Sequence, residues 1–308
     1  MNSKVKTVIK DGLVGIGIGC AIIIPGISGG TIALITGAFK KIVNAVDKLL
    51  SKYFLKNFLI LLPFGIGAIL AIAGLYFPIR FSFVNCFLAI TCLFAAFMVG
   101  SLPSIRDNFK GQKLTAPNWI GMIIGFIVVI AFGVLSILFN LDEQVQTMFT
   151  NNDFYLYPII FGVGVISSMG LIVPGFSGSM LLMVIGFYDK LLGLISEMKT
   201  APGLSILRLL VFAVGVAVGF IAFSKLMKWL FEKHETTANC IVFGFLAGSI
   251  IAIFVNSNAF NYYGYYSGTT SINILDYILS PIFVIIGLAI SLFIYFYMKK
   301  HPEEKEDA

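Results

Sequence analysis

Charged residues are scarce in this chain, and their scarcity excludes most soluble folds. Of the 308 residues, 12% are charged and 58% are hydrophobic. A soluble domain carries about 25% charged residues, so the composition indicates a polytopic membrane protein. The net charge of +6 is then best explained by lysines in cytoplasmic loops, and we expect no nucleic-acid partner.

Side chains that hold metals or carry out acid–base chemistry are also few. The chain has two histidines and four cysteines, and without a C-x-x-C pair no zinc or iron–sulfur site is predicted. No glutamate precedes Glu143. A Walker lysine is missing, as is a G-x-G-x-x-G followed by its usual acid, which argues against nucleotide binding. The sequence therefore predicts no catalytic residue, no metal and no cofactor.

What the chain does contain is a motif that occurs twice, 149 residues apart. Its copies are P-G-I-S-G-G-T at 25–31 and P-G-F-S-G-S-M at 174–180, and each interrupts an apolar run. Proline stops a helix, and the arms beside each motif have roughly 11 residues, whereas a membrane crossing needs about 20. Each run is therefore predicted to form a re-entrant hairpin with its tip near the midplane. The alternative is a pair of packed helices that are merely kinked.

Other residues keep the same spacing in both halves. Gly15 and Gly164 lie ten residues before their prolines, and Gly37 and Gly186 lie twelve after them. The further pairs are Lys41 with Lys190 at the same offset, Gly65 with Gly215 at an offset of 150, and Gly100-Ser101 with Gly248-Ser249 at 148. This regularity predicts an internal repeat.

The predicted fold is an all-α polytopic membrane protein built as an inverted repeat, each half with one re-entrant hairpin and three transmembrane helices. The first half, 1–150, has its tip at 25–31 and spans at about 58–78, 81–103 and 119–141. The second half, 151–308, has its tip at 174–180 and spans at about 207–227, 238–255 and 278–297. Basic connectors and an acidic one at 142–153 place both termini in the cytoplasm. Because each half crosses three times, the second half is inverted.

Both tips are predicted to bind an anion. The helix after each break starts at the motif, so its unpaired N–H groups and the positive end of its dipole face the tip. Glycines allow a close approach and hydroxyls add donors, which suits phosphate or carboxylate. The predicted substrate-binding residues here are Pro25, Gly26, Ser28, Gly29, Gly30, Thr31, Pro174, Gly175, Ser177, Gly178 and Ser179.

Arg80 is the predicted cation for such an anion. It lies at a predicted outer boundary, against the trend that places positive charge inside, and ionisable residues in membrane segments are candidates for function. We expect it to recruit a phosphate headgroup from the outer leaflet. The alternative is that its side chain snorkels to lipid headgroups.

These motifs resemble those of a known family. The segments 25–31 and 174–180, with Gly37 and with Gly186-Phe187-Tyr188 after them, are similar to the paired motifs of the bacterial polyprenyl-phosphate (undecaprenyl phosphate) transporters of the PopT type, over nearly the whole chain. The resemblance implies a flippase of the bacterial plasma membrane. It would return undecaprenyl phosphate, a lipid carrier in cell wall biogenesis, from the outer to the cytoplasmic leaflet. The implied partners are that polyprenyl phosphate lipid and the membrane lipids.

Two other functions are compatible with this architecture. An undecaprenyl-pyrophosphate phosphatase has a similar phosphate loop, but with an arginine where this chain has Gly29 or Gly178, and it uses paired glutamates that neither motif has nearby. A small-anion transporter or channel also holds its ion at helix N-termini. For the lipid transporter we expect the headgroup to dock between the tips while the prenyl tail stays in lipid.

Overall fold

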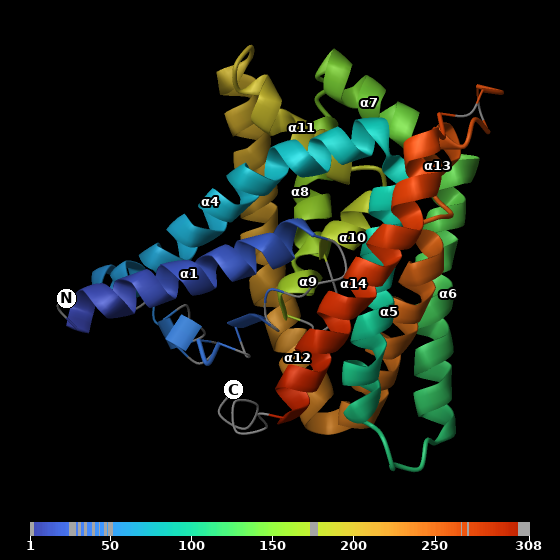
Figure 1. Cartoon of the computed structure of the whole chain (residues 1–308). Helices are drawn as coiled ribbons and strands as arrows, with labels where there is room; N and C mark the ends of the chain where they lie inside the picture. Colours follow the sequence, from blue (N-terminus) through green and yellow to red (C-terminus); the bar gives the residue numbers. More distant parts are fainter. Residues whose placement is uncertain are drawn as a thin grey trace.

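In the computed structural model, helix is the only regular secondary structure among the residues that it describes. These are 3–24, 29, 32–33, 36–38, 41–42, 44–45, 48, 52–172, 178–265, 267–269 and 271–300. Within those ranges the chain forms helices and no strands, which confirms the all-α prediction (Figure 1).

Six helical segments in these ranges are long and apolar enough to cross a membrane. They lie in α4 (Phe54–Asn85), α5 (Phe87–Asp107), α6 (Ala116–Leu138), the two limbs of α12 (Pro202–Ala252) and α14 (Ile274–Lys300). The limbs of α12 meet at His234, whose φ of −142° and ψ of 46° are not helical. They supply the spans Pro202–Phe223 and Lys233–Tyr262. The length and apolar composition of these helices identify a polytopic membrane protein.

The remaining helices are shorter or begin with charged residues. They are α1 (Ser3–Ile23), α7 (Leu141–Asn151), α8 (Leu156–Ser167), α9 (Met169–Ile172), α10 (Gly178–Val184), α11 (Tyr188–Glu197) and α13 (Ser257–Tyr262). With 12 and 7 residues, α8 and α10 fall short of the about 20 that a crossing needs. In contrast, α1 has 21 residues and starts well before the predicted arm at 14–24, because its early lysines favour a helix.

The predicted boundary between the first two spans is wrong. A break is expected at 78–81, but α4 continues through Pro78 to Asn85, and the chain turns at Cys86, with φ of −150° and ψ of 57°. A proline in a membrane helix is tolerated where hydroxyls and neighbouring helices satisfy the freed backbone groups. The carbonyl that loses its N–H donor is that of Gly74, and the Ser82 hydroxyl bonds a different group, the Pro78 carbonyl, at 2.9 Å.

Glycines bring α1 onto α4 and α8 onto the first limb of α12. A Cβ added at Gly15 would lie 2.3 Å from the Phe64 carbonyl oxygen, and one added at Gly164 would lie 2.4 Å from that of Phe212. In hydrocarbon, small residues are what allow helix backbones to approach so closely. Gly19 meets Ala68 one turn beyond the first contact, so α1 and α4 run in the same direction.

The predicted repeat register is shifted by two residues in α4. A Cβ at Gly67 would lie 2.1 Å from the Gly12 carbonyl oxygen, whereas one at Gly65 would meet nothing within 4 Å. The residue that corresponds to Gly215 is therefore Gly67, since a Cβ at Gly215 would lie 2.2 Å from the Phe161 carbonyl oxygen of α8. Only the glycine that faces the neighbouring helix, α1 for Gly67 and α8 for Gly215, has to be small.

Two further pairs form the upright part of the bundle in Figure 1, α5 with α14 and α6 with the second limb of α12. Gly287 of α14 faces Ala96, and Ser291 one turn later faces Gly100, so α5 and α14 run in the same direction. For α6 and α12 the corresponding contacts are Met122 with Gly244 and Phe126 with Gly248. These helices are therefore parallel as well.

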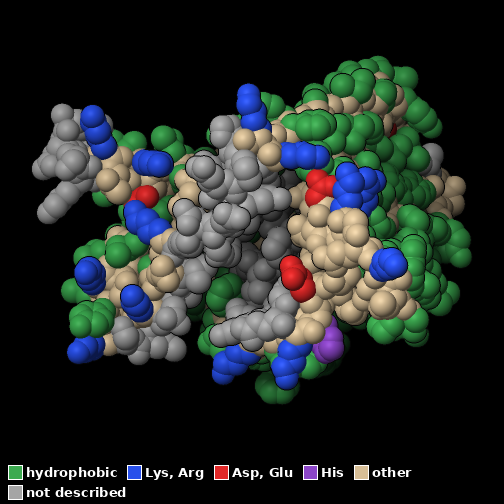
Figure 2. Space-filling model, turned by 90° about the horizontal axis from the view of Figure 1, so that it is seen from below, with side chains coloured by type: hydrophobic (Ala, Val, Ile, Leu, Met, Phe, Trp, Pro, Cys, Tyr) green, Lys and Arg blue, Asp and Glu red, His purple; other side chains and the backbone are tan. Residues whose placement is uncertain are grey.

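Positive charge gathers at one end of the bundle, the basic end, where the α5–α6 connection, the turn of α12 and the last part of α14 meet. Asn108 Nδ2 donates to Asn239 Oδ1 at 3.1 Å, and the Tyr295 hydroxyl donates to Asp107 at 2.7 Å. The basic residues here are Arg106, Lys110, Lys113, Lys233, Lys299 and Lys300. Figure 2 views the molecule from this side, with mostly Lys and Arg among the charged side chains. At the opposite end lie α7, α11 and α13.

The segments that follow the two motifs end in the same way. Gly37 and Gly186 have φ values of +68° and +79°, which only glycine adopts readily. In both halves the N–H of the next residue donates at 2.9 Å to the carbonyl five residues earlier. This is the hydrogen bond of a Schellman C-cap, and it fixes where each segment turns away.

Substituting Gly164 by alanine should destabilise the protein, because the new Cβ would meet the Phe212 backbone. Overpacking of this kind costs about 1–3 kcal/mol. On the same helix, a Cβ at Gly162 meets nothing within 4 Å, so Gly162→Ala should keep or slightly raise stability through helix propensity. The melting temperature of the purified protein in detergent measures both changes, and an equal effect of the two variants would contradict this packing.

Candidate functional site

The structure describes four of the twelve residues that the sequence predicts to bind substrate. Gly29, Gly178, Ser179 and Arg80 fall within the described ranges. The other eight lie outside the described residues: Pro25, Gly26, Ser28, Gly30, Thr31, Pro174, Gly175 and Ser177.

A cavity of about 400 Å³ lies where the two motif segments meet. Gly29 lines it from the first segment, and Gly178 and Ser179 line it from the second. Helices α1 and α10 also contact each other. The structure thus brings the described residues of both motifs to one space, although 149 residues separate them.

Gly29 of the first motif packs on α1 and Gly178 of the second packs on α8, at equivalent positions. A Cβ at Gly29 would lie 3.3 Å from Cγ2 of Ile18, and one at Gly178 would lie 2.2 Å from the carbonyl oxygen of Ser167. Ile18 and Ser167 are themselves 149 residues apart. Because glycine exposes its main chain, this packing leaves backbone close to the cavity.

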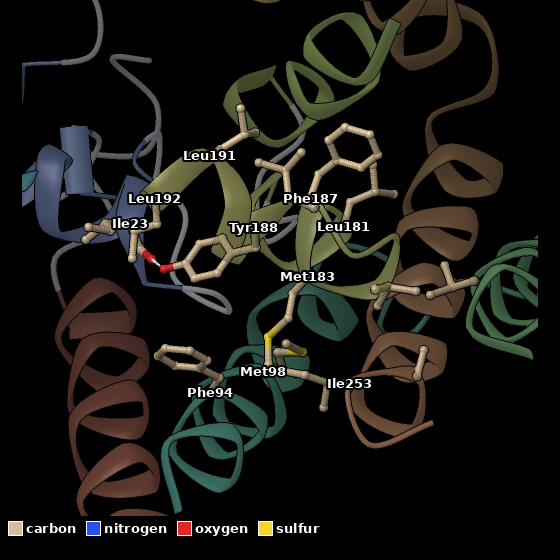
Figure 3. Close-up of a cluster of buried hydrophobic side chains, with 14 of the residues drawn as sticks. Ile23, Phe94, Met98, Leu181, Met183, Phe187, Tyr188, Leu191, Leu192 and Ile253 are labelled. Carbon is tan, nitrogen blue, oxygen red and sulfur yellow. Dashed lines mark hydrogen bonds between the residues drawn. The ribbon is translucent and has the colours of Figure 1, made fainter. Parts of the chain in front are cut away.

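Tyr188 joins the two halves beside the cavity (Figure 3). It is the first residue of α11 and is 4% exposed. Its hydroxyl donates at 2.5 Å to the carbonyl of Ile23, the last residue of α1. Carbonyls at a helix C-terminus have no partner within the helix, so this bond satisfies a group that would otherwise be buried alone. The Tyr188 ring packs on Phe83, with ring centroids 5.4 Å apart.

Helix α11 separates the apolar cavity from a second, polar cavity. Leu191, Leu192 and Ile195 of α11 line the apolar cavity. The polar cavity has a volume of about 200 Å³ and is lined by Arg80, Gln146, Phe149, Thr150, Asp189, Lys190, Gly193 and Glu197. One face of α11 is therefore apolar and the other is charged.

Arg80 lies in the polar cavity and already has a carboxylate partner. Its Nη1 is 2.6 Å from Asp189 Oδ1, and the two side chains are 37% and 23% exposed. Lys190 Nζ lies 4.0 Å from carboxylate oxygens of both Asp189 and Asp142. Burial raises the pKa of the Asp142 carboxyl, and Lys190 acts against that shift. Arg80 thus links α4 to α11. A side chain that only snorkels to lipid headgroups would not make this contact.

The sequence that forms this cavity can be compared with the sequences of known families. Residues 18–270 match the model of a family described as undecaprenyl phosphate translocase-like, which is well over half of the chain. The chain belongs to this undecaprenyl phosphate translocase-like family. Membership confirms the resemblance seen in the paired motifs.

Two curated relatives align with most of this chain. A polyprenyl-phosphate transporter of Staphylococcus aureus is 27% identical over 282 residues, which cover 91% of this chain and 93% of the relative. A polyprenyl-phosphate transporter of Vibrio cholerae is 25% identical over 264 residues, which cover 81% and 79%. No solved structure matches this member of the translocase-like family significantly.

The sequence analysis missed a buried cation, Arg208 on the first limb of α12. Its side chain is 2% exposed, and its Nη2 donates to the Phe149 carbonyl at 2.7 Å and to Asn152 Oδ1 at 3.1 Å. The guanidinium also lies 4.9 Å from the centroid of the Phe149 ring. The argument that selected Arg80, a cation in an apolar span, applies equally to Arg208. These contacts fasten α7 to α12 next to the polar cavity.

Removing the Tyr188 hydroxyl should loosen the link between α1 and α11. Tyr188→Phe keeps the ring but leaves the Ile23 carbonyl buried without this partner, at a cost of about 1–3 kcal/mol. Tyr155 serves as the control, since it is exposed and its hydroxyl donates to Asp153. Thermal unfolding in detergent should show a clear loss for Tyr188→Phe and almost none for Tyr155→Phe. Equal melting temperatures would show that the bond contributes nothing.

Proposed function

We propose that this protein is a membrane transporter, a flippase that returns undecaprenyl phosphate from the outer to the cytoplasmic leaflet. Family membership and the names of the two relatives support a polyprenyl phosphate substrate. One structural observation carries the proposal: residues of both motifs line the same cavity. Breaks at corresponding positions of two halves are typical of a transporter binding site.

We propose that the headgroup phosphate docks between residues 28–31 and 177–179. Glycines there let the phosphate approach backbone N–H groups, and the serine and threonine hydroxyls add donors. Pro25-Gly26 and Pro174-Gly175 would interrupt the helices so that these groups are available. A phosphate at this position would touch both halves of the chain.

We also propose that residues 1–150 and 151–308 form an inverted repeat with the motifs at the tips of re-entrant hairpins. The parallel packing of α1 with α4 supports this. The second arm of a re-entrant hairpin returns to the side of the membrane from which the first arm entered. The next helix therefore crosses the membrane in the same direction as the first arm. The short α8 and the shared C-caps at Gly37 and Gly186 agree with it. The basic end would face the cytoplasm, and rocking of the halves would expose the phosphate to each leaflet in turn.

A phosphatase function receives less support from the residues that line the cavity. Phosphate ester hydrolysis needs a base, a nucleophile or carboxylates that hold a metal. None of the described residues that line the cavity is Asp, Glu, His or Cys. We therefore propose that the protein transports its lipid without chemical change.

Replacing Ser28 and Ser177 together by alanine should abolish transport, because the phosphate would lose hydroxyl donors on both sides. In liposomes that contain the purified protein, transbilayer movement of polyprenyl phosphate should fall to the rate of protein-free liposomes. Ser82→Ala is the control, since that hydroxyl bonds within α4. Movement by the double variant at the unaltered rate would remove these serines from the site.

We propose that Arg80 receives the phosphate at the outer leaflet by exchanging Asp189 for the headgroup. Charge-assisted hydrogen bonds contribute about 1.5–3 kcal/mol, so Arg80→Gln should weaken the apparent affinity for the lipid by about tenfold or more. Asp189→Asn should strengthen it, because the competing carboxylate is gone. The measurement is the initial rate against the density of polyprenyl phosphate in the outer leaflet.

The opposite changes in apparent affinity expected for Arg80→Gln and Asp189→Asn distinguish capture of the phosphate from a purely structural ion pair. If Arg80 and Asp189 only join α4 to α11, both variants should lower the melting temperature and leave the apparent affinity unchanged. Arg106→Gln at the basic end controls for the loss of a positive charge far from the polar cavity.

A further inference from the structure

We infer that the apolar cavity beside the motif segments receives the isoprenoid units next to the phosphate, so that protein surrounds the first part of the prenyl chain. The inference rests on the proposed function and specifies its substrate site. It replaces the sequence-based expectation that the whole prenyl tail stays in lipid.

The first argument is the continuity of the site. Gly29 and Ser179, which belong to the two motifs, line the same cavity as Ile72 of α4 and Val216 of α12. The prenyl chain is bonded to the phosphate through a single ester oxygen, so its first units must lie a few bond lengths from the docked phosphate. The space at that distance is this cavity.

The second argument is the chemistry of the lining. Most of the lining residues are aliphatic, and the described ones include no Lys, Arg, Asp, Glu or His. Two of its polar groups are already bonded, since Ser167 Oγ donates to the Gly164 carbonyl at 3.0 Å and Tyr188 donates to that of Ile23.

A volume of about 400 Å³ lies within the range of about 300–1,000 Å³ that is usual for apolar ligand pockets with few polar groups. Beyond the motif residues, the described lining offers a phosphate ion no charged partner, whereas it can cover an apolar chain. The lining therefore selects a phosphate that carries an apolar chain.

An apolar path leads from the cavity to the lipid for the rest of the prenyl chain. Ile72, Leu209 and Val216 are half-buried at the cavity wall, whereas Ile69 and Leu210 on the same helices are 67% and 57% exposed. Apolar surface thus continues from the cavity to the outer faces of α4 and α12. The later isoprenoid units leave along this surface into the bilayer.

Filling the cavity tests the inference. In liposomes, Ile72→Trp and Val216→Phe should each slow polyprenyl phosphate movement by about tenfold or more, as expected when a bulky group displaces a bound segment. Ile66→Trp and Val214→Phe are matched controls on the exposed faces of the same helices and should move lipid at the unaltered rate. Cavity variants that fold and match their controls would overturn the inference. No movement by the unaltered protein would instead overturn the proposed function.

A second measurement uses the unaltered chain, so it does not depend on whether the variants fold. A polyprenyl phosphate with a diazirine on the isoprene unit next to the phosphate is bound to the protein and photolysed, and the labelled peptides are sequenced. Adducts should form at cavity residues such as Leu192, Leu209 and Phe212. Adducts confined to exposed residues such as Ile69 and Val214 would show that the tail stays in lipid.

Discussion

A backbone group that is not hydrogen-bonded within its own helix must find another partner in hydrocarbon, and the structure around the cavity follows from that requirement. Helix α1 ends at Ile23, and its last carbonyl is satisfied by Tyr188 from the other half of the chain. Gly178 packs directly on the Ser167 carbonyl oxygen. Interrupted helices are therefore tolerated here because protein covers them, and the same contacts form the walls of the cavity.

Helix α11 is one of the places where the two halves meet, beside the packing of α5 on α14 and of α6 on α12. Its apolar face forms part of the cavity in which we place the first isoprenoid units, and its charged face lines the polar cavity with Arg80. The contacts of α11 with the first half, which include Tyr188 to Ile23, Asp189 to Arg80 and Lys190 to Asp142, cross the interface between the proposed repeats. If the halves rock to expose the phosphate, these polar contacts and the packing of α5 on α14 and of α6 on α12 must break or move. Close glycine packing joins helices within each half, as between α1 and α4, and also across the halves, as between α5 and α14.

Much of this organisation can be predicted from the sequence. Composition and run length are enough for an all-α membrane protein, because spanning hydrocarbon requires long apolar helices. The spacing of the motifs led to the expectation that they meet, and Gly29, Gly178 and Ser179 do line one cavity. The spacing of Gly37 and Gly186 pointed to equivalent positions, and both have positive φ.

The parts that failed depend on contacts between helices. The break predicted at Pro78 is absent because a proline in a membrane helix can be accommodated by its neighbours. The choice between Gly65 and Gly67 depends on which one faces α1, which spacing alone does not determine. Arg80 was predicted to receive the phosphate, and its carboxylate partner Asp189 was not predicted because it lies 109 residues away. The bond from Tyr188 to Ile23 was not predicted, because it is fixed by packing rather than by local sequence.

The central claim is that a phosphate carried on a prenyl chain, and not a free anion, moves through this protein unchanged. The most direct measurement places the purified, unaltered protein in liposomes and follows three quantities together: transbilayer movement of polyprenyl phosphate, release of inorganic phosphate, and flux of inorganic phosphate across the bilayer. The account predicts movement of the lipid with neither release nor flux. Flux of inorganic phosphate without lipid movement, or release of phosphate from a pyrophosphate lipid, would contradict it.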